Sequence, residues 1–250
     1  MSWSEVKYAL NSSLGTEAFM SLDKLIPYYI AYQSGIHVQE FTTPGSYTLS
    51  VPKWANSVKI TAAGGGGGGG FSDGNKQGTG GGGGAAILNS IHDVSAIASL
   101  TIVVGSGGRA GKESSSTNNT GEQGGTTSIA ELNIVLNGGY GGKYVVNSSY
   151  NVGGAAGGAG GGAGGKTGYA GSNGISGSGG TSDASSKSGG GGGGSIGSGG
   201  DAAVYISYTT PERHGATAGV RGGGGGGGAY TSEYEPAAGG DGYVKLEFLP

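Results

Sequence analysis

Runs of consecutive glycines constrain this chain more than any other feature of its sequence. All but three of its 64 glycines lie between residues 64 and 242, in blocks such as residues 64–70 and 222–228. At about a third of the residues there, glycine reaches the level at which a collagen triple helix is considered. The glycines follow no strict three-residue period and the chain has only 6 prolines, so collagen is excluded.

Glycine can instead form an extended three-fold helix that resembles polyproline II and has no internal hydrogen bonds. Its N–H and C=O groups must then bond to neighbouring chains, and only glycine lets the backbones come close enough. The runs therefore predict a bundle of polyglycine II helices whose core is made of backbone. A flexible glycine linker is the alternative, because ordering glycine costs the most backbone entropy.

Composition divides the chain into a helical attachment segment at residues 1–35, leading β-strands at 36–63, and a glycine-rich sandwich with a C-terminal strand at 64–250. Ser2 and Glu5 form a capping box at the start of the first region. An apolar stripe follows at helical spacing, and we expect it to attach the chain to a larger partner: Trp3, Val6, Leu10 and Leu14. Packing of this stripe on the rest of the chain is the alternative.

Residues on both sides of the glycine region alternate apolar and polar side chains with period two, which predicts β-strands. The N-terminal side has these patterns at residues 38–41, 47–51 and 58–60, with the turn signal Pro44-Gly45 between the first two. The C-terminal side has one at residues 243–248. The glycine region thus has a strand at each of its ends.

We count ten glycine runs, which begin at Gly64, Gly78, Gly105, Gly121, Gly138, Gly153, Gly168, Gly189, Gly215 and Gly239. Of the nine connections between them, the odd-numbered ones are rich in Ser, Asn, Thr, Tyr and charged residues: 71–77, 112–120, 143–152, 181–188 and 229–238. The second, fourth and eighth are apolar and strand-like, around residues 87–104, 129–136 and 204–206. If successive runs are antiparallel, the polar connections lie at one end, and the apolar ones lie with the flanking strands at the other.

Charge and hydropathy exclude several classes of partner. Charged residues make up 12% of the chain and the net charge is −3, so no dense basic face is available for nucleic acid. The most apolar stretch, residues 94–104, is about half the length of a membrane-spanning helix, and the N-terminus lacks the pattern of a secretory signal. We therefore expect a soluble product made in the cytoplasm, with no membrane insertion.

Motifs for chemistry are weak in this sequence. Residues 160–167 (GGGAGGKT) match a phosphate-binding loop, but no strand precedes them and no helix follows. Residues 70–74 match a hydrolase nucleophile elbow, yet seven glycines stand where a buried strand is required. The three histidines are far apart, and Gly84 occupies the position of the closing glutamate of a calcium loop that would begin at Asp73. We expect no enzyme activity, no metal and no cofactor.

Tyrosine among Ser, Asn and Gly in the odd-numbered connections resembles the composition of antibody binding loops. Simple solvated turns are the alternative. The predicted receptor-binding residues are Phe71, Asp73, Asn75, Lys76, Gln77, Glu113, Asn118, Asn119, Tyr144, Asn147, Tyr150, Asn151, Asp183, Lys187, Tyr230, Glu233, Tyr234 and Glu235.

The glycine-rich region resembles the distal adhesins of the long tail fibres of T-even-type bacteriophages. Residues 41–52 (FTTPGSYTLSVP) and 58–61 (VKIT), followed by the first run, are similar to the leading strands of such domains, whereas residues 3–16 and 22–26 resemble prophage tail-fibre segments. The resemblance implies a polyglycine II sandwich of about ten antiparallel runs that presents variable loops to a bacterial cell-surface receptor.

The same resemblance implies that residues 1–35 bind a fibre or baseplate protein. The protein would then belong to a virion or a phage-tail-like particle that is released from the host cytoplasm by lysis. A structural glycine-rich protein or an ice-binding polyglycine II protein, neither with a specific receptor, is the alternative.

Overall fold

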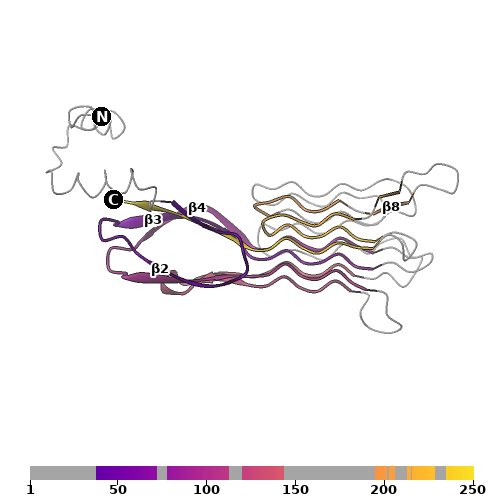
Figure 1. Cartoon of the computed structure of the whole chain (residues 1–250), viewed down its shortest axis with the longest axis horizontal. Helices are drawn as coiled ribbons and strands as arrows, with labels where there is room; N and C mark the ends of the chain where they lie inside the picture. Colours follow the sequence, from indigo (N-terminus) through magenta and orange to yellow (C-terminus); the bar gives the residue numbers. More distant parts are fainter. Residues whose placement is uncertain are drawn as a thin grey trace, which may run out of the picture.

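The computed structural model describes residues 38–71, 78–112, 120–143, 195–201, 203–205, 213–214, 216–228 and 235–250. This part of the chain has two regions, a β-sandwich at one end and a bundle of extended glycine-rich segments at the other (Figure 1). One short 3-10 helix, η1 (Ala130–Leu132), occurs in the described residues, and no α-helix does.

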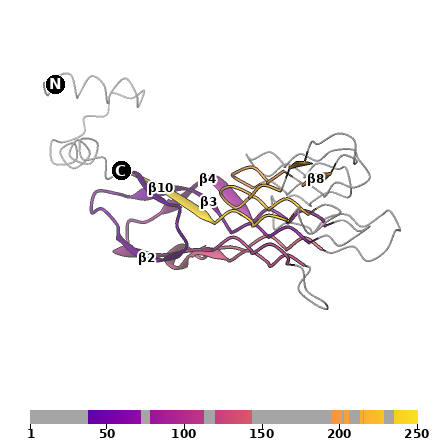
Figure 2. The same cartoon turned by 45° about the vertical axis from the view of Figure 1, so that its right-hand side comes forward.

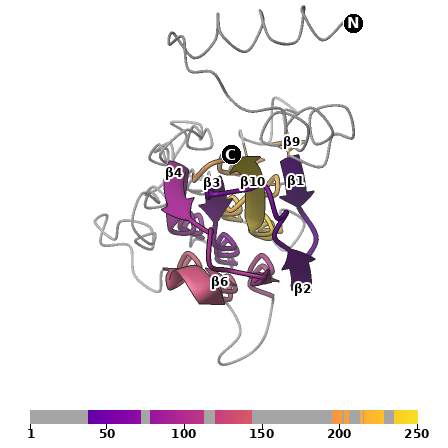
Figure 3. The same cartoon turned by 90° about the vertical axis from the view of Figure 1, so that its left-hand side faces the viewer.

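Two four-stranded antiparallel sheets form the sandwich (Figure 3). The first has the order β1-β10-β3-β4, with bounds Val38–Phe41, Tyr243–Leu249, Ser57–Ala63 and Ala86–Asp93. The second has the order β2-β5-β6-β7, with bounds Gly45–Ser50, Ser99–Val104, Thr127–Ile129 and Ile134–Leu136. The strands predicted at both ends of the glycine region, and in the second and fourth connections, are therefore confirmed.

The facing sides of the two sheets enclose an apolar core. Alternate residues of the central strands point into it and have no exposed surface: Val58, Ile60, Leu100, Ile102, Val244 and Leu246. Phe41 and Tyr47 pack against this core with ring centroids 4.9 Å apart, and the Tyr47 hydroxyl donates to the Thr43 carbonyl at 2.8 Å. The sandwich is held together by interdigitating side chains, as in other sheet-on-sheet domains.

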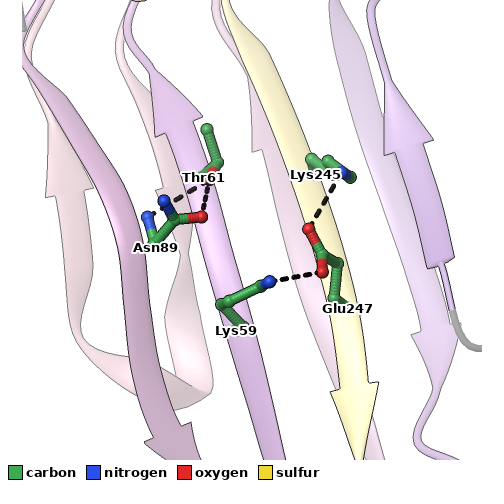
Figure 4. A network of polar contacts seen from close by, with 5 residues as sticks. All are labelled: Lys59, Thr61, Asn89, Lys245 and Glu247. Atoms are coloured by element: carbon green, nitrogen blue, oxygen red, sulfur yellow. Dashed lines mark hydrogen bonds and ion pairs between the residues drawn. The ribbon is translucent and has the colours of Figure 1, made fainter. Parts of the chain in front are cut away.

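The outer side of the first sheet carries a polar network (Figure 4). Glu247 pairs with Lys59 at 2.6 Å and with Lys245 at 2.9 Å. The hydrogen bonds from Lys245 and then from Lys59 hold the pKa of the Glu247 carboxyl below its ordinary value. Beside them the Thr61 hydroxyl accepts the backbone N–H of Asn89 at 3.2 Å, where β4 has a bulge and Asn89 has a φ of 53°.

Six strands continue directly into glycine-rich segments, so the two sheets become two layers of the bundle (Figures 1 and 2). Layer one continues the second sheet and consists of residues 105–112, 121–126 and 137–143. Layer two continues the first sheet and consists of residues 235–242, 64–70 and 78–85. Layer three packs on the other side of layer two and consists of residues 195–201, 216–220 and 222–228.

Residues 64–70 lie at the centre of the bundle and are hydrogen-bonded to six other segments. Their seven N–H groups donate in strict rotation to three antiparallel segments, 78–85, 121–126 and 235–242, at 2.8 to 3.0 Å. Their carbonyl groups accept in the same rotation from three parallel segments, 105–112, 137–143 and 222–228. A Cβ atom on any of these seven glycines would overlap the backbone of a neighbouring segment, so glycine is required at every position.

The sequence predicted one continuous run from Gly215 to Gly228, and this prediction is wrong. The chain reverses at Val220, whose carbonyl accepts the N–H of Gly223 at 2.9 Å. Arg221 and Gly222 have φ values of 42° and 83°, the left-handed conformation that a tight reversal needs. Residues 216–220 and 222–228 are therefore two antiparallel segments, because Val220 and Arg221 interrupt the glycines where the chain turns.

The eighth connection lies at the opposite end from the one predicted. Residues 195–201 run parallel to residues 222–228, away from the sandwich, since the N–H groups of Gly197 and Gly200 donate to the carbonyls of Arg221 and Gly224. The strand β8 (Val204–Tyr205) therefore lies at the far end of the bundle, where Figure 1 labels it, and pairs with β9 (Arg213–His214). Apolar residues there form a separate hairpin and do not join the sandwich.

Two contacts join layer three to the layer beneath it near the sandwich. The guanidinium of Arg221 lies 4.8 Å from the ring centroid of Tyr243, which is 4% exposed. Burial raises the pKa of the Tyr243 hydroxyl, and the neighbouring Glu40 carboxylate raises it further. The buried hydroxyl of Ser195 donates to the Gly84 carbonyl at 2.9 Å. These contacts fix the reversal at Val220 and the start of residues 195–201 against the ends of β10 and β4.

The predicted attachment helix at residues 1–35 lies outside the described residues. So do the starts of the runs predicted at Gly153, Gly168, Gly189 and Gly215.

Candidate functional site: the loop-bearing end of the bundle

The ends of several glycine segments meet at the end of the bundle that faces away from the sandwich. The Gly70 N–H donates to the Thr79 carbonyl at 2.8 Å, and the Thr79 N–H donates to the Lys143 carbonyl at 3.0 Å. On the other side, Gly228 donates to Gly70 at 3.0 Å and accepts from Gly78 at 3.1 Å. The connections that leave or enter at these residues therefore start from one surface.

Layer three contributes to the same surface. The Ala203 N–H donates to the Gly227 carbonyl at 3.0 Å, one residue before the Gly228 contacts described above. In layer one, the Gly111 N–H donates to the Gly69 carbonyl at 2.9 Å. The first, third, fifth, eighth and ninth connections thus begin or end at this end of the bundle, which we call the loop-bearing end.

Thr79 is a buried polar residue in this surface, with 2% of its area exposed. Its hydroxyl accepts the backbone N–H of Lys143 at 2.7 Å and lies 3.4 Å from the carbonyl of the same residue. This side chain ties the start of one loop-bearing segment to the end of another. The Thr79 side chain therefore fixes the distance between the ends of two glycine segments, at the points where the first and fifth connections join them.

Two of the predicted receptor-binding residues lie in the described part of the chain. Glu235 is exposed at the loop-bearing end, as a binding residue must be. Phe71 is 2% exposed, so its prediction as a receptor contact is wrong: the residue directly after the central glycine segment packs inward. Outside the described residues lie Asp73, Asn75, Lys76, Gln77, Glu113, Asn118, Asn119, Tyr144, Asn147, Tyr150, Asn151, Asp183, Lys187, Tyr230, Glu233 and Tyr234.

The chain enters and leaves the described fold at the opposite end. Strand β1 pairs with β10 so that Val38 is opposite Glu247 and Phe41 is opposite Val244. Since β10 runs away from the bundle, Val38 lies toward the end of the sandwich that is farthest from the loops, as does Pro250. The residues predicted to attach the chain, Trp3, Val6, Leu10 and Leu14, precede this point and lie outside the described residues.

Sequence reasoning missed the hairpin of β8 and β9 as part of the loop-bearing end. It used the apolar residues 204–206 alone and assigned them to the sandwich. The signal that could have found the hairpin is the second half of the same connection, where Pro211 and Glu212 mark a turn before Arg213. A strand that pairs locally across such a turn does not need a place in a larger sheet.

The described residues contain no group of histidine, aspartate or glutamate side chains that could hold a metal ion. Within the same residues, no helix has the length and hydropathy to cross a membrane. The described groups at the loop-bearing end are backbone N–H and C=O groups, the Thr79 hydroxyl and the exposed side chains at the ends of the glycine segments. These groups can bind a ligand by contact.

Comparison with known families gives one assignment. Residues 42–249 match the model of a family described as a glycine-rich domain. This match covers most of the chain, from the turn after β1 to the last residue of β10, and the protein belongs to this glycine-rich domain family. No curated protein matches the chain.

Proposed function

We propose that this protein is the receptor-binding protein of a bacteriophage or a phage-tail-like particle. In this proposal the variable connections at the loop-bearing end bind a receptor on the bacterial surface, either an outer protein or a glycan. The observation that carries it is the separation of the two ends. The connections leave the glycine segments at one end of the bundle, while the described fold begins at Val38 and ends at Pro250 at the other.

The second part of the proposal is that the bundle is a polyglycine II sandwich. Support comes from the strict rotation of hydrogen-bond partners along residues 64–70, which returns to the same neighbouring segment every third residue. A helix with three residues per turn and no internal hydrogen bonds requires this rotation. A β-strand, in contrast, exchanges its hydrogen bonds with two neighbours within one plane.

Attachment to the particle is assigned to residues 1–35, through the stripe Trp3, Val6, Leu10 and Leu14. The proposed partner is a fibre or baseplate protein, and the proposed location is the distal tail fibre. Support comes from the position of Val38, where the segment joins the sandwich at the end opposite the loops. A receptor contact and a particle contact at the same end would exclude one another.

An ice-binding or purely structural role has less support. An ice-binding face needs regularly spaced small residues such as Ala or Thr on a flat surface. The exposed positions of residues 137–143, at three-residue spacing, are Asn137, Tyr140 and Lys143, and those of residues 105–112 are Ser106, Arg109 and Lys112. Bulky and charged side chains of this kind interrupt a flat face.

The direct test replaces residues 230–234 (YTSEY) of the ninth connection by a Gly-Ser linker of equal length and measures binding of the fluorescent protein to a panel of bacterial strains. We expect loss of binding to the strains that the parent protein recognises, with an unchanged melting temperature. The matched control is Lys53→Ala, an exposed change in the turn between β2 and β3 of the sandwich. Loss of binding in the control alone would assign the receptor site to the sandwich instead.

A further inference from the structure

The outer face of layer one differs in charge and composition from the rest of the molecule. Among its described residues the exposed charged side chains are Arg109, Lys112 and Lys143 against one carboxylate, Glu122. The whole chain has a net charge of −3. The described part of layer one therefore has an excess of positive charge, although the net charge of the whole chain is negative. Its surface between these side chains consists of glycine backbone.

Tyr140 is the large aromatic side chain of this layer, and it is 56% exposed. Its neighbours in sequence are glycines, which offer no side chains to cover the ring. The three segments of layer one all hydrogen-bond to residues 64–70, so they curve around that central segment. An exposed aromatic ring on this bare backbone can stack on a ligand and covers no apolar core. Its exposure points to a ligand with flat, weakly polar surfaces, such as a sugar ring.

The hydrogen-bond register gives the positions of the exposed side chains along the bundle axis, and it places them in two pairs, each at nearly the same height. Gly108 and Gly111 donate to Gly66 and Gly69, while Gly139 and Gly142 donate to Gly65 and Gly68. With residues 64–70 as the common scale, Arg109 lies within about one residue of the level of Tyr140. By the same scale, Lys112 lies within about one residue of the level of Lys143. The second pair is one three-residue period nearer to the loop-bearing end, or about 9 Å at the rise of a polyproline-type helix.

Residues 121–126 lie between the two rows and supply hydrogen-bonding groups. Gln123 is exposed, and its side-chain amide donates to the Gly138 carbonyl at 3.3 Å, which leaves its own carbonyl oxygen as an acceptor for a ligand. The three segments are linked by backbone hydrogen bonds of 2.7 to 2.9 Å, so the rows cannot slide past one another. The array is rigid before any ligand arrives, which lowers the entropy cost of binding.

We propose that layer one binds an acidic polysaccharide that lies along the bundle toward the loops. Sugar rings stack on Tyr140, and carboxylate or phosphate groups of successive sugars pair with Arg109 and with Lys143. Arginine suits this role because its planar guanidinium binds a carboxylate or phosphate with two parallel hydrogen bonds. The inference extends the proposed receptor-binding function to a second surface, and it rests on described residues and not on the loops.

Affinity electrophoresis of the full chain in native gels tests the inference. The gels contain alginate or polygalacturonate as carboxylate polymers, a phosphate-bearing teichoic acid, or neutral dextran. We expect retardation by at least one acidic polymer and none by dextran. Arg109→Ala and Tyr140→Ala are each expected to weaken the interaction about tenfold, or ~1.4 kcal/mol, while Tyr140→Phe retains it because the ring is kept.

The matched control is the pair Lys53→Ala and Val220→Ala, which removes an exposed cation and an exposed apolar side chain outside layer one. The control is expected to migrate as the parent protein does, and melting curves check that all variants are folded. Absence of retardation in every acidic polymer, or equal retardation of the parent and the Arg109 and Tyr140 variants, would overturn the inference. Neither result bears on cell binding through the loops, so the two proposals fail separately.

Discussion

The sandwich and the glycine bundle are continuous along the chain, yet they are stabilised by opposite means. In the sandwich, side chains such as Ile60 and Leu246 fill the space between two sheets, and the backbones of facing sheets stay apart. In the bundle, backbones touch, and a single Cβ atom would separate them. The comparison teaches that a close-packed interior needs complementary surfaces, and that bare backbone can provide them when its polar groups are paired.

The bundle is expected to be far less tolerant of added atoms than the sandwich. Gly225→Val places a side chain against the Ala237 and Ala238 carbonyls of the neighbouring segment. We expect no soluble folded protein, because overpacking of a backbone interface cannot be relieved by a change of rotamer. Expression level and melting temperature measure the effect. Ser106→Val, at an exposed position of layer one, is the control and is expected to fold.

The sandwich is expected to respond to the removal of atoms instead. Ile60→Ala empties space in a fully buried site between the two sheets and is expected to cost about 2–5 kcal/mol of unfolding free energy. Denaturant titration of the variant against the parent measures this loss. A cost below about 1 kcal/mol would mean that the bundle, and not the side-chain core, limits the stability of the whole chain.

A third prediction asks whether a buried side chain, that of Thr79, contributes to the unfolding free energy within the glycine bundle. Thr79→Val keeps the shape but removes the hydroxyl that accepts the Lys143 N–H. We expect a loss of about 1 kcal/mol, since the partly buried Lys143 N–H loses its acceptor. Thr79→Ser restores the acceptor and is expected to recover most of the loss. Equal stability of the Val variant would mean that water replaces the hydroxyl.

The smallest expected effect is the acid sensitivity of the sandwich surface. The pKa of Glu247 is lowered by Lys245 and Lys59, so its contribution is present at neutral pH and is lost as the pH falls through the lowered pKa. Because the pairs are partly exposed, we expect less than ~1 kcal/mol. Melting temperatures at pH 7 and pH 3 are compared for the parent and Glu247→Gln, and the variant is expected to lose less stability on acidification.

Much of the fold could be predicted because two kinds of local pattern were strong. Period-two alternation located β1, β3 and β10, and apolar connections located β4 to β7. The first five glycine segments are antiparallel in succession, which was the assumption under which the polar and apolar connections were predicted to lie at opposite ends. These features depend on short-range sequence, since a strand with alternating side chains has one face to bury wherever it lies.

The predictions that failed concern segments whose structure depends on residues elsewhere in the chain. The reversal at Val220 was missed because two non-glycine residues look like a minor interruption of a run, whereas Gly222 with a positive φ makes them a turn. The hairpin of β8 and β9 was assigned to the wrong end, because an apolar strand can pair locally or join a sheet. Phe71 was taken for a surface anchor because its side-chain direction depends on neighbours that are remote in sequence.

The sequence by itself determined that the chain has a glycine region with strands at both ends and polar connections between its runs. Composition and alternation are properties of single segments, so they can be found without knowledge of contacts. Only the tertiary structure decided which segments touch, which way residues 195–201 run, and that Arg109 and Tyr140 share one layer. Those facts depend on hydrogen bonds between segments far apart in the chain, and glycines, having no side chains, leave no sequence signal for the partner they choose.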